Sequence, residues 1–71
     1  MRNNIALKLS KMSEEEREQY LKDNAKSFNF EDFYKVAEKS KSTALYNKDT
    51  QLYSRLTTTK AHVEMFDPKF H

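Results

Sequence analysis

Apolar residues recur at helical spacing from the start of the chain. Ile5, Leu9 and Met12 have the spacing of one face of a short amphipathic helix that ends near Met12. Ser13 and Glu16 then form the pattern of a capping box, in which each side chain accepts a hydrogen bond from the other residue's backbone amide. We therefore expect a second helix to begin after Ser13.

The clearest local pattern marks the start of a third helix. Asn29 is a good N-cap residue, and Phe28 can pack against Phe33 as a hydrophobic staple. The next apolar positions fall on one stripe of a helix, which we expect to lie at the centre of the core: Phe30, Phe33, Tyr34 and Ala37.

Polar residues from Glu38 to Ser42 interrupt this stripe, so we expect a break there, then a short helix over 43–46 and a turn over 47–49. A last helix should begin at Asp49 or Thr50 and stop before Pro68. Residues 57–66 also alternate between apolar and polar, so a short C-terminal strand or wing is an alternative there. The apolar stripe of the last helix either closes the core of a monomer or forms the seam of a homodimer: it consists of Leu52, Leu56, Val63 and Phe66.

Composition strengthens the prediction of helices. The chain has 71 residues, no glycine and a single proline, so it has few of the residues that tight β-turns need. We expect an all-α fold: one small bundle of three to five helices over residues 1–66, followed by a frayed tail over 67–71. The chain has no cysteine and no apolar window of membrane-spanning length, which favours a soluble, cytoplasmic protein that does not enter a membrane.

The residues offer little support for catalysis. Without glycine there is no phosphate-binding loop, and without cysteine there is no thiol nucleophile. The spacing of His62 and His71 fits no compact metal motif. We therefore expect no enzymatic activity, no cofactor and no metal.

Charge is distributed unevenly along the chain. Residues 1–34 carry six basic and seven acidic side chains, whereas residues 35–60 carry six basic and two acidic ones. A basic block can be the footprint of a phosphate backbone, although it can equally be a solvated helix face. The acidic run after Ser13 suits the start of a helix, where the dipole favours negative charge, and it can also meet a basic protein surface; its candidate protein-binding residues are Glu14, Glu15 and Glu18.

Within the basic block, Val36-Ala37 is followed by Ser42-Thr43-Ala44-Leu45-Tyr46, and this pattern resembles the helix-turn-helix of bacterial regulators and mobile-element proteins. The resemblance covers about residues 30–56. It departs from the family in having no glycine in the turn and Ser40 where an apolar anchor is usual. It implies a recognition helix in the major groove of DNA. Another interpretation is that Leu45 and Tyr46 are core residues of a connecting helix.

Two functions follow as hypotheses. The first is a small DNA-binding accessory protein, helix-turn-helix-like, of a phage or other mobile genetic element. Its nucleic-acid-binding residues would be Lys39, Lys41, Ser42, Thr43, Tyr46, Lys48 and Arg55. The alternative is a protein-binding subunit or inhibitor of a larger replication, recombination or defence enzyme, which would use the acidic start of the second helix and the aromatic residues.

Overall fold

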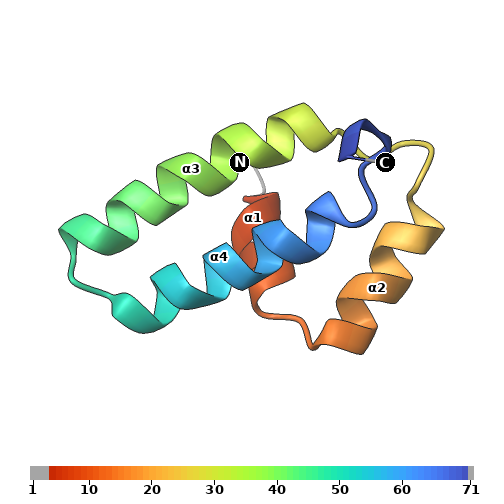
Figure 1. Ribbon diagram of the computed structural model, residues 1–71. Helices are drawn as coiled ribbons and strands as arrows, with labels where there is room; N and C mark the ends of the chain where they lie inside the picture. Colours follow the sequence, from red (N-terminus) through yellow and green to blue (C-terminus); the bar gives the residue numbers. More distant parts are fainter. Residues whose placement is uncertain (1–3, 71) are drawn as a thin grey trace.

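The computed structural model describes residues 4–70 and is all-α (Figure 1). Along the chain lie four α-helices and one 3₁₀ turn, with no strand among the described residues: α1 Ile5–Ser10, α2 Glu14–Asp23, α3 Phe30–Tyr46, α4 Thr50–Glu64 and η1 Pro68–Phe70. The predicted small helical bundle is confirmed. Residues 57–64 are helical, so the alternative of a C-terminal strand is wrong.

The longest helices, α3 and α4, run side by side as a hairpin, and α1 packs against both (Figure 1). At one end of the hairpin, α2 and η1 lie near the start of α3 and the end of α4; we call this the closed end. At the other end a short turn joins α3 to α4, and residues 45–51 are all exposed; we call this the open end.

The core lies where α1, α3 and α4 meet. Phe33 and Ala37 are fully buried on α3, and they pack with Leu9 of α1 and with Leu56 and Val63 of α4. The predicted central stripe is therefore confirmed at its two most buried positions. Of the apolar stripe on the last helix, Leu56 and Val63 lie in this core and are inaccessible to solvent, while Leu52 and Phe66 are half-buried.

Side-chain caps start the helices where the sequence indicated. Ser13 and Glu16 form the full capping box of α2. Asn29 Oδ1 accepts a hydrogen bond from the amide of Asp32 at 3.0 Å, and Asp49 Oδ1 accepts one from the amide of Leu52 at 3.1 Å. Each cap acts across only three residues, which explains why sequence alone located these helix starts.

The predicted break from Glu38 to Ser42 is wrong, because α3 continues through it to Tyr46. Ser40 faces α1, where its Oγ accepts a hydrogen bond from Asn4 Nδ2 at 3.0 Å. Glu38 pairs with Lys60 of α4 at 2.8 Å. Partners on other helices thus satisfy the polar side chains that suggested a break. The turn that the helix-turn-helix resemblance requires at these residues is absent.

Residues 67–70, expected to be frayed, are held at the closed end. Asp67 is buried, and its Oδ2 accepts a hydrogen bond from the Tyr34 hydroxyl at 2.7 Å. The Phe70 ring lies edge-on to the Tyr34 ring, and Lys69 Nζ lies 2.8 Å from Glu31 Oε1. The prediction of a frayed tail is therefore wrong for these residues, while His71 lies outside the described part of the chain. None of the helices described is both long and apolar enough to cross a bilayer.

Candidate functional site

The structure gives one residue of the predicted DNA-binding set partners within the fold. Lys41 is turned toward the seam between α3 and α4, where its side chain is only 17% exposed. Its Nζ lies 3.9 Å from Glu38 Oε1 and 5.3 Å from the centre of the Tyr53 ring. Lys41 is thus held by a carboxylate and an aromatic face.

The same carboxylate also holds the neighbouring cation of α4. Lys60 donates a hydrogen bond to Glu38, which lowers the pKa of the Glu38 carboxyl and raises the pKa of the Lys60 ammonium. Two lysines therefore share one carboxylate along the seam.

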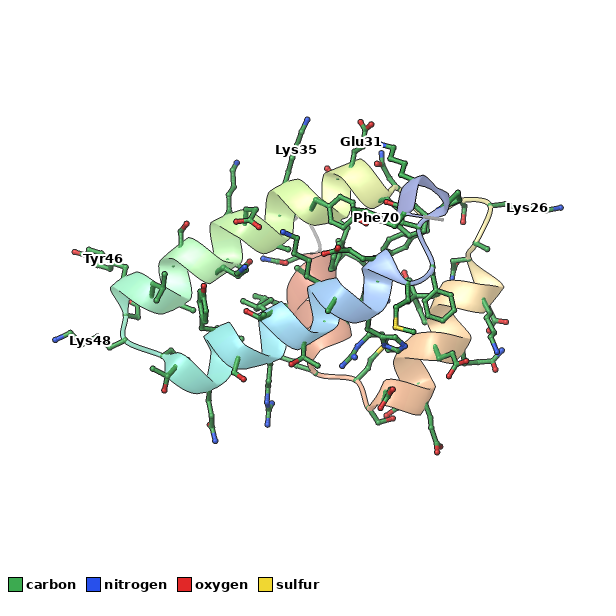
Figure 2. The ribbon with its side chains drawn as sticks, viewed as in Figure 1. Lys26, Glu31, Lys35, Tyr46, Lys48 and Phe70 are labelled. Carbon is green, nitrogen blue, oxygen red and sulfur yellow. The ribbon has the colours of Figure 1, made fainter. Side chains whose placement is uncertain are left out.

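Ser42 and Tyr46 lie on the exposed side of α3. Tyr46 is 88% exposed and Leu45 is 59% exposed, so the interpretation of both as core residues is wrong. Ala44 takes the buried position of this turn instead. Figure 2 shows Tyr46 and Lys48 projecting from the open end, away from the bundle.

Lys48 has an unusual backbone conformation. Its φ of 57° is left-handed, and it is the one residue with positive φ in the described chain. The amide of Lys48 donates to the Leu45 carbonyl at 3.0 Å, and the amide of Asp49 donates to the Ala44 carbonyl at 2.8 Å. These bonds form a Schellman motif, whose left-handed position usually holds glycine or asparagine. A lysine there is about 1 kcal/mol less favourable than glycine.

A row of shallow hollows follows the exposed side of α1 and continues onto α3 and α4. One hollow lies against Asn4, Leu7, Lys8 and Lys11. The next shares Asn4 and Leu7 and is completed by Lys39, Ser40, Thr43 and Leu52. A third shares Leu52 and is completed by Asp49, Gln51 and Arg55. Neighbouring hollows share lining residues, and we call the surface that the three span the α1 groove.

Four cations line the α1 groove, one or two from each of three helices: Lys8, Lys11, Lys39 and Arg55. Within residues 4–70, none of them lies at ion-pair distance from a carboxylate. Lys8 has a different partner, since its Nζ lies 5.0 Å from the centre of the Tyr20 ring. The groove has one carboxylate, Asp49, which caps α4. The net charge of the α1 groove is therefore strongly positive.

The structure thus regroups the predicted nucleic-acid-binding residues. It brings Lys39, Thr43 and Arg55 to the α1 groove and leaves Ser42, Tyr46 and Lys48 near or at the open end. Sequence reasoning missed Lys8 and Lys11, because acidic residues of α2 balance them in the linear count of charge. The sequence did hold a signal for them: at helical spacing, Lys8 and Lys11 fall with Leu7 on the outward side of the first amphipathic helix.

The predicted acidic surface is only partly free. Glu16 completes the capping box, and Glu18 forms an ion pair with Lys22 at 3.1 Å. Glu14 and Glu15 remain exposed in the first turn of α2. Across residues 4–70, no three histidine, aspartate or glutamate side chains come together as metal ligands. Comparison of the chain with protein-family models, curated proteins and solved structures gives no match.

Proposed function

We propose that this chain is a small nucleic-acid-binding accessory protein that holds a phosphate backbone along the α1 groove. The observation that carries the proposal is the convergence of Lys8, Lys11, Lys39 and Arg55 on one surface without a carboxylate partner in the described chain. The groove, rather than a recognition helix, supplies the contacts in this proposal.

Unpaired cations suit this role because each one that meets a phosphate releases a condensed counterion into solution. A lysine already paired with a carboxylate, such as Lys41, must lose that partner first. Four phosphate contacts predict that affinity falls by about 50- to 150-fold between about 50 and about 200 mM salt. Among the neutral lining residues, Gln51 provides an amide that can donate hydrogen bonds to phosphate and sugar oxygens.

The test is fluorescence anisotropy of labelled oligonucleotides at several salt concentrations. Lys8→Glu combined with Lys39→Glu should weaken binding at least about tenfold, because two phosphate contacts become repulsive. The matched control is Lys22→Glu combined with Lys26→Glu, which changes net charge equally on and just after α2. Figure 2 shows Lys26 at the closed end, with its side chain pointing away from the bundle. Equal losses in both double variants, or no binding at low salt, would contradict the proposal.

A second candidate function, binding to a larger protein, is favoured by one observation. Leu45 and Tyr46 form an exposed apolar pair at the open end, and exposed aromatic residues are frequent anchors of protein interfaces. Leu45→Ala separates the functions: it should leave oligonucleotide binding unchanged, whereas binding of a protein partner through this exposed apolar pair would weaken.

A further inference from the structure

We infer that the nucleic acid held by the α1 groove is single-stranded, and that Tyr46 stacks on one of its bases. This inference rests on the proposed function and specifies its ligand. Single-stranded binding sites combine a positive groove that follows the backbone with aromatic rings that stack on bases. The structure provides both features on connected parts of α3.

Tyr46 continues the groove along α3. It follows Thr43 by three residues and Lys39 by seven, so the three side chains lie on neighbouring turns of the same side of the helix. Thr43 and Lys39 line the groove beside Leu52 of α4. A strand that leaves the groove past Thr43 therefore reaches Tyr46 within one helical turn.

Tyr46 is also the tyrosine whose ring is available. Tyr20 lies against Phe28 and under Lys8, Tyr34 lies against Phe33 and Phe70, and Tyr53 lies under Lys41. In residues 4–70 no ring or cation contact involves Tyr46, which is 88% exposed. Figure 2 shows its side chain extending beyond the open end of the hairpin.

Lys48 adds a cation beside this ring, at a position where the backbone favours glycine. Strained residues are often retained at binding sites, because the side chain is needed there. Lys39 lies two helical turns before Tyr46 on α3 and Lys48 follows it by two residues, so cations flank the ring along the chain.

The form of the ligand follows from the shape of the surface and the chemistry of bases. A duplex is read by an element that projects into its major groove, about 12 Å wide. The groove cations are instead spread over three packed helices around hollows. In a duplex the faces of internal bases are covered by their neighbours, so Tyr46 would find no free face. An unpaired strand presents both its phosphates and its base faces.

The experiment uses the full chain and oligonucleotides of about 12 nucleotides, single-stranded DNA, single-stranded RNA and duplex DNA. Tyr46→Ala should weaken binding of the single strands about tenfold and leave duplex binding unchanged, while Tyr46→Phe should bind like the original chain. Leu45→Ala is the matched control, because Leu45 is the neighbouring exposed apolar residue. A preference between the DNA and RNA arms identifies the sugar that the groove favours.

A second variant reports stacking directly. The chain has no tryptophan, so Tyr46→Trp places a single indole, which can be excited selectively over tyrosine, at the site. Single strands should quench its emission as a base stacks on the indole ring. Single-strand binding that Tyr46→Ala does not weaken, absence of quenching on saturation, or tighter binding of duplex would overturn the inference while leaving the proposed function standing. Failure of every nucleic acid to bind at low salt would overturn both.

Discussion

The two ends of the α3–α4 hairpin use the same kinds of residue in opposite ways. At the closed end, the Tyr34 hydroxyl donates to buried Asp67, and burial together with this bond raises the pKa of Tyr34. At the open end, Tyr46 has no ring partner among the described residues, and Lys48 has no carboxylate partner there. Aromatic and charged groups therefore stabilise the fold at one end and are left available for a ligand at the other.

The largest expected difference between the ends is in stability. Phe33→Ala should destabilise the protein by about 3 to 5 kcal/mol, because it removes a fully buried ring from the core near the closed end. That is comparable to the whole stability of so small a domain. Leu45→Ala at the open end should change stability by less than about 0.5 kcal/mol. Thermal unfolding followed by circular dichroism measures both; equal losses would contradict the contrast.

Mutation at the joint, the contact where α1, α2 and α4 meet, should reduce stability nearly as much. Buried Arg17 donates through Nε to the Leu9 carbonyl and through Nη2 to the Met12 carbonyl, each at 3.1 Å, and Nη1 lies 3.1 Å from His62 Nδ1. Burial lowers the pKa of the Arg17 guanidinium. Arg17→Met should destabilise the protein by about 1.5 to 3 kcal/mol, because it leaves these acceptors without their donor.

Urea denaturation measures this loss of stability, with Lys22→Met as the control. Lys22 has an exposed ion pair on the same helix, whose loss should change stability by less than about 1 kcal/mol. A loss at Arg17 no larger than at Lys22 would show that the buried hydrogen bonds do not stabilise the joint.

At the open end, one substitution should move stability and binding in opposite directions. Lys48→Gly should stabilise the protein by about 1 kcal/mol, because glycine adopts the left-handed conformation without steric conflict. It should also weaken oligonucleotide binding a few-fold through the lost charge. Lys48→Ala is the control, since it removes the charge and keeps the conformational penalty. Calorimetry measures the stability of both variants and anisotropy measures their oligonucleotide binding. A gain of stability in Lys48→Ala would refute the explanation by the left-handed conformation.

The smallest expected effect is on stability at low pH, and it comes from the Glu38–Lys60 ion pair between α3 and α4. The hydrogen bond from Lys60 holds the pKa of Glu38 below its ordinary value of 4.5. The pair therefore contributes stability above that value, and the contribution is lost as pH falls through the lower folded pKa. Glu38→Gln should reduce this acid sensitivity, measured as the melting temperature from pH 7 to pH 2. Glu31→Gln should act similarly through Lys69, and an unchanged profile in both variants would argue against these ion pairs.

Sequence reasoning succeeded where the determinants are local. The capping groups Ser13, Asn29 and Asp49 act on amides three residues away, and the stripe containing Phe33 and Ala37 lies within one helix. These features predicted the helices and the centre of the core without any knowledge of tertiary contacts.

It failed where a partner lies far along the chain. Ser40 is satisfied by Asn4, and Asp67 by Tyr34, so neither the continuity of α3 nor the docked tail was visible locally. The candidate site changed for the same reason. Which lysines remain available depends on distant pairs such as Lys60 with Glu38, whose formation requires the folded hairpin.

The most direct test of the α1 groove is the dependence of single-strand affinity on salt, measured for three forms of the chain. Four phosphate contacts predict a slope of about −3 in a plot of log affinity against log salt. Lys39→Gln with Arg55→Gln should reduce its magnitude by about 1.4, while Lys22→Gln with Lys26→Gln should leave it unchanged. A slope near zero, or the same reduction in both double variants, would show that the groove is not where the phosphates bind.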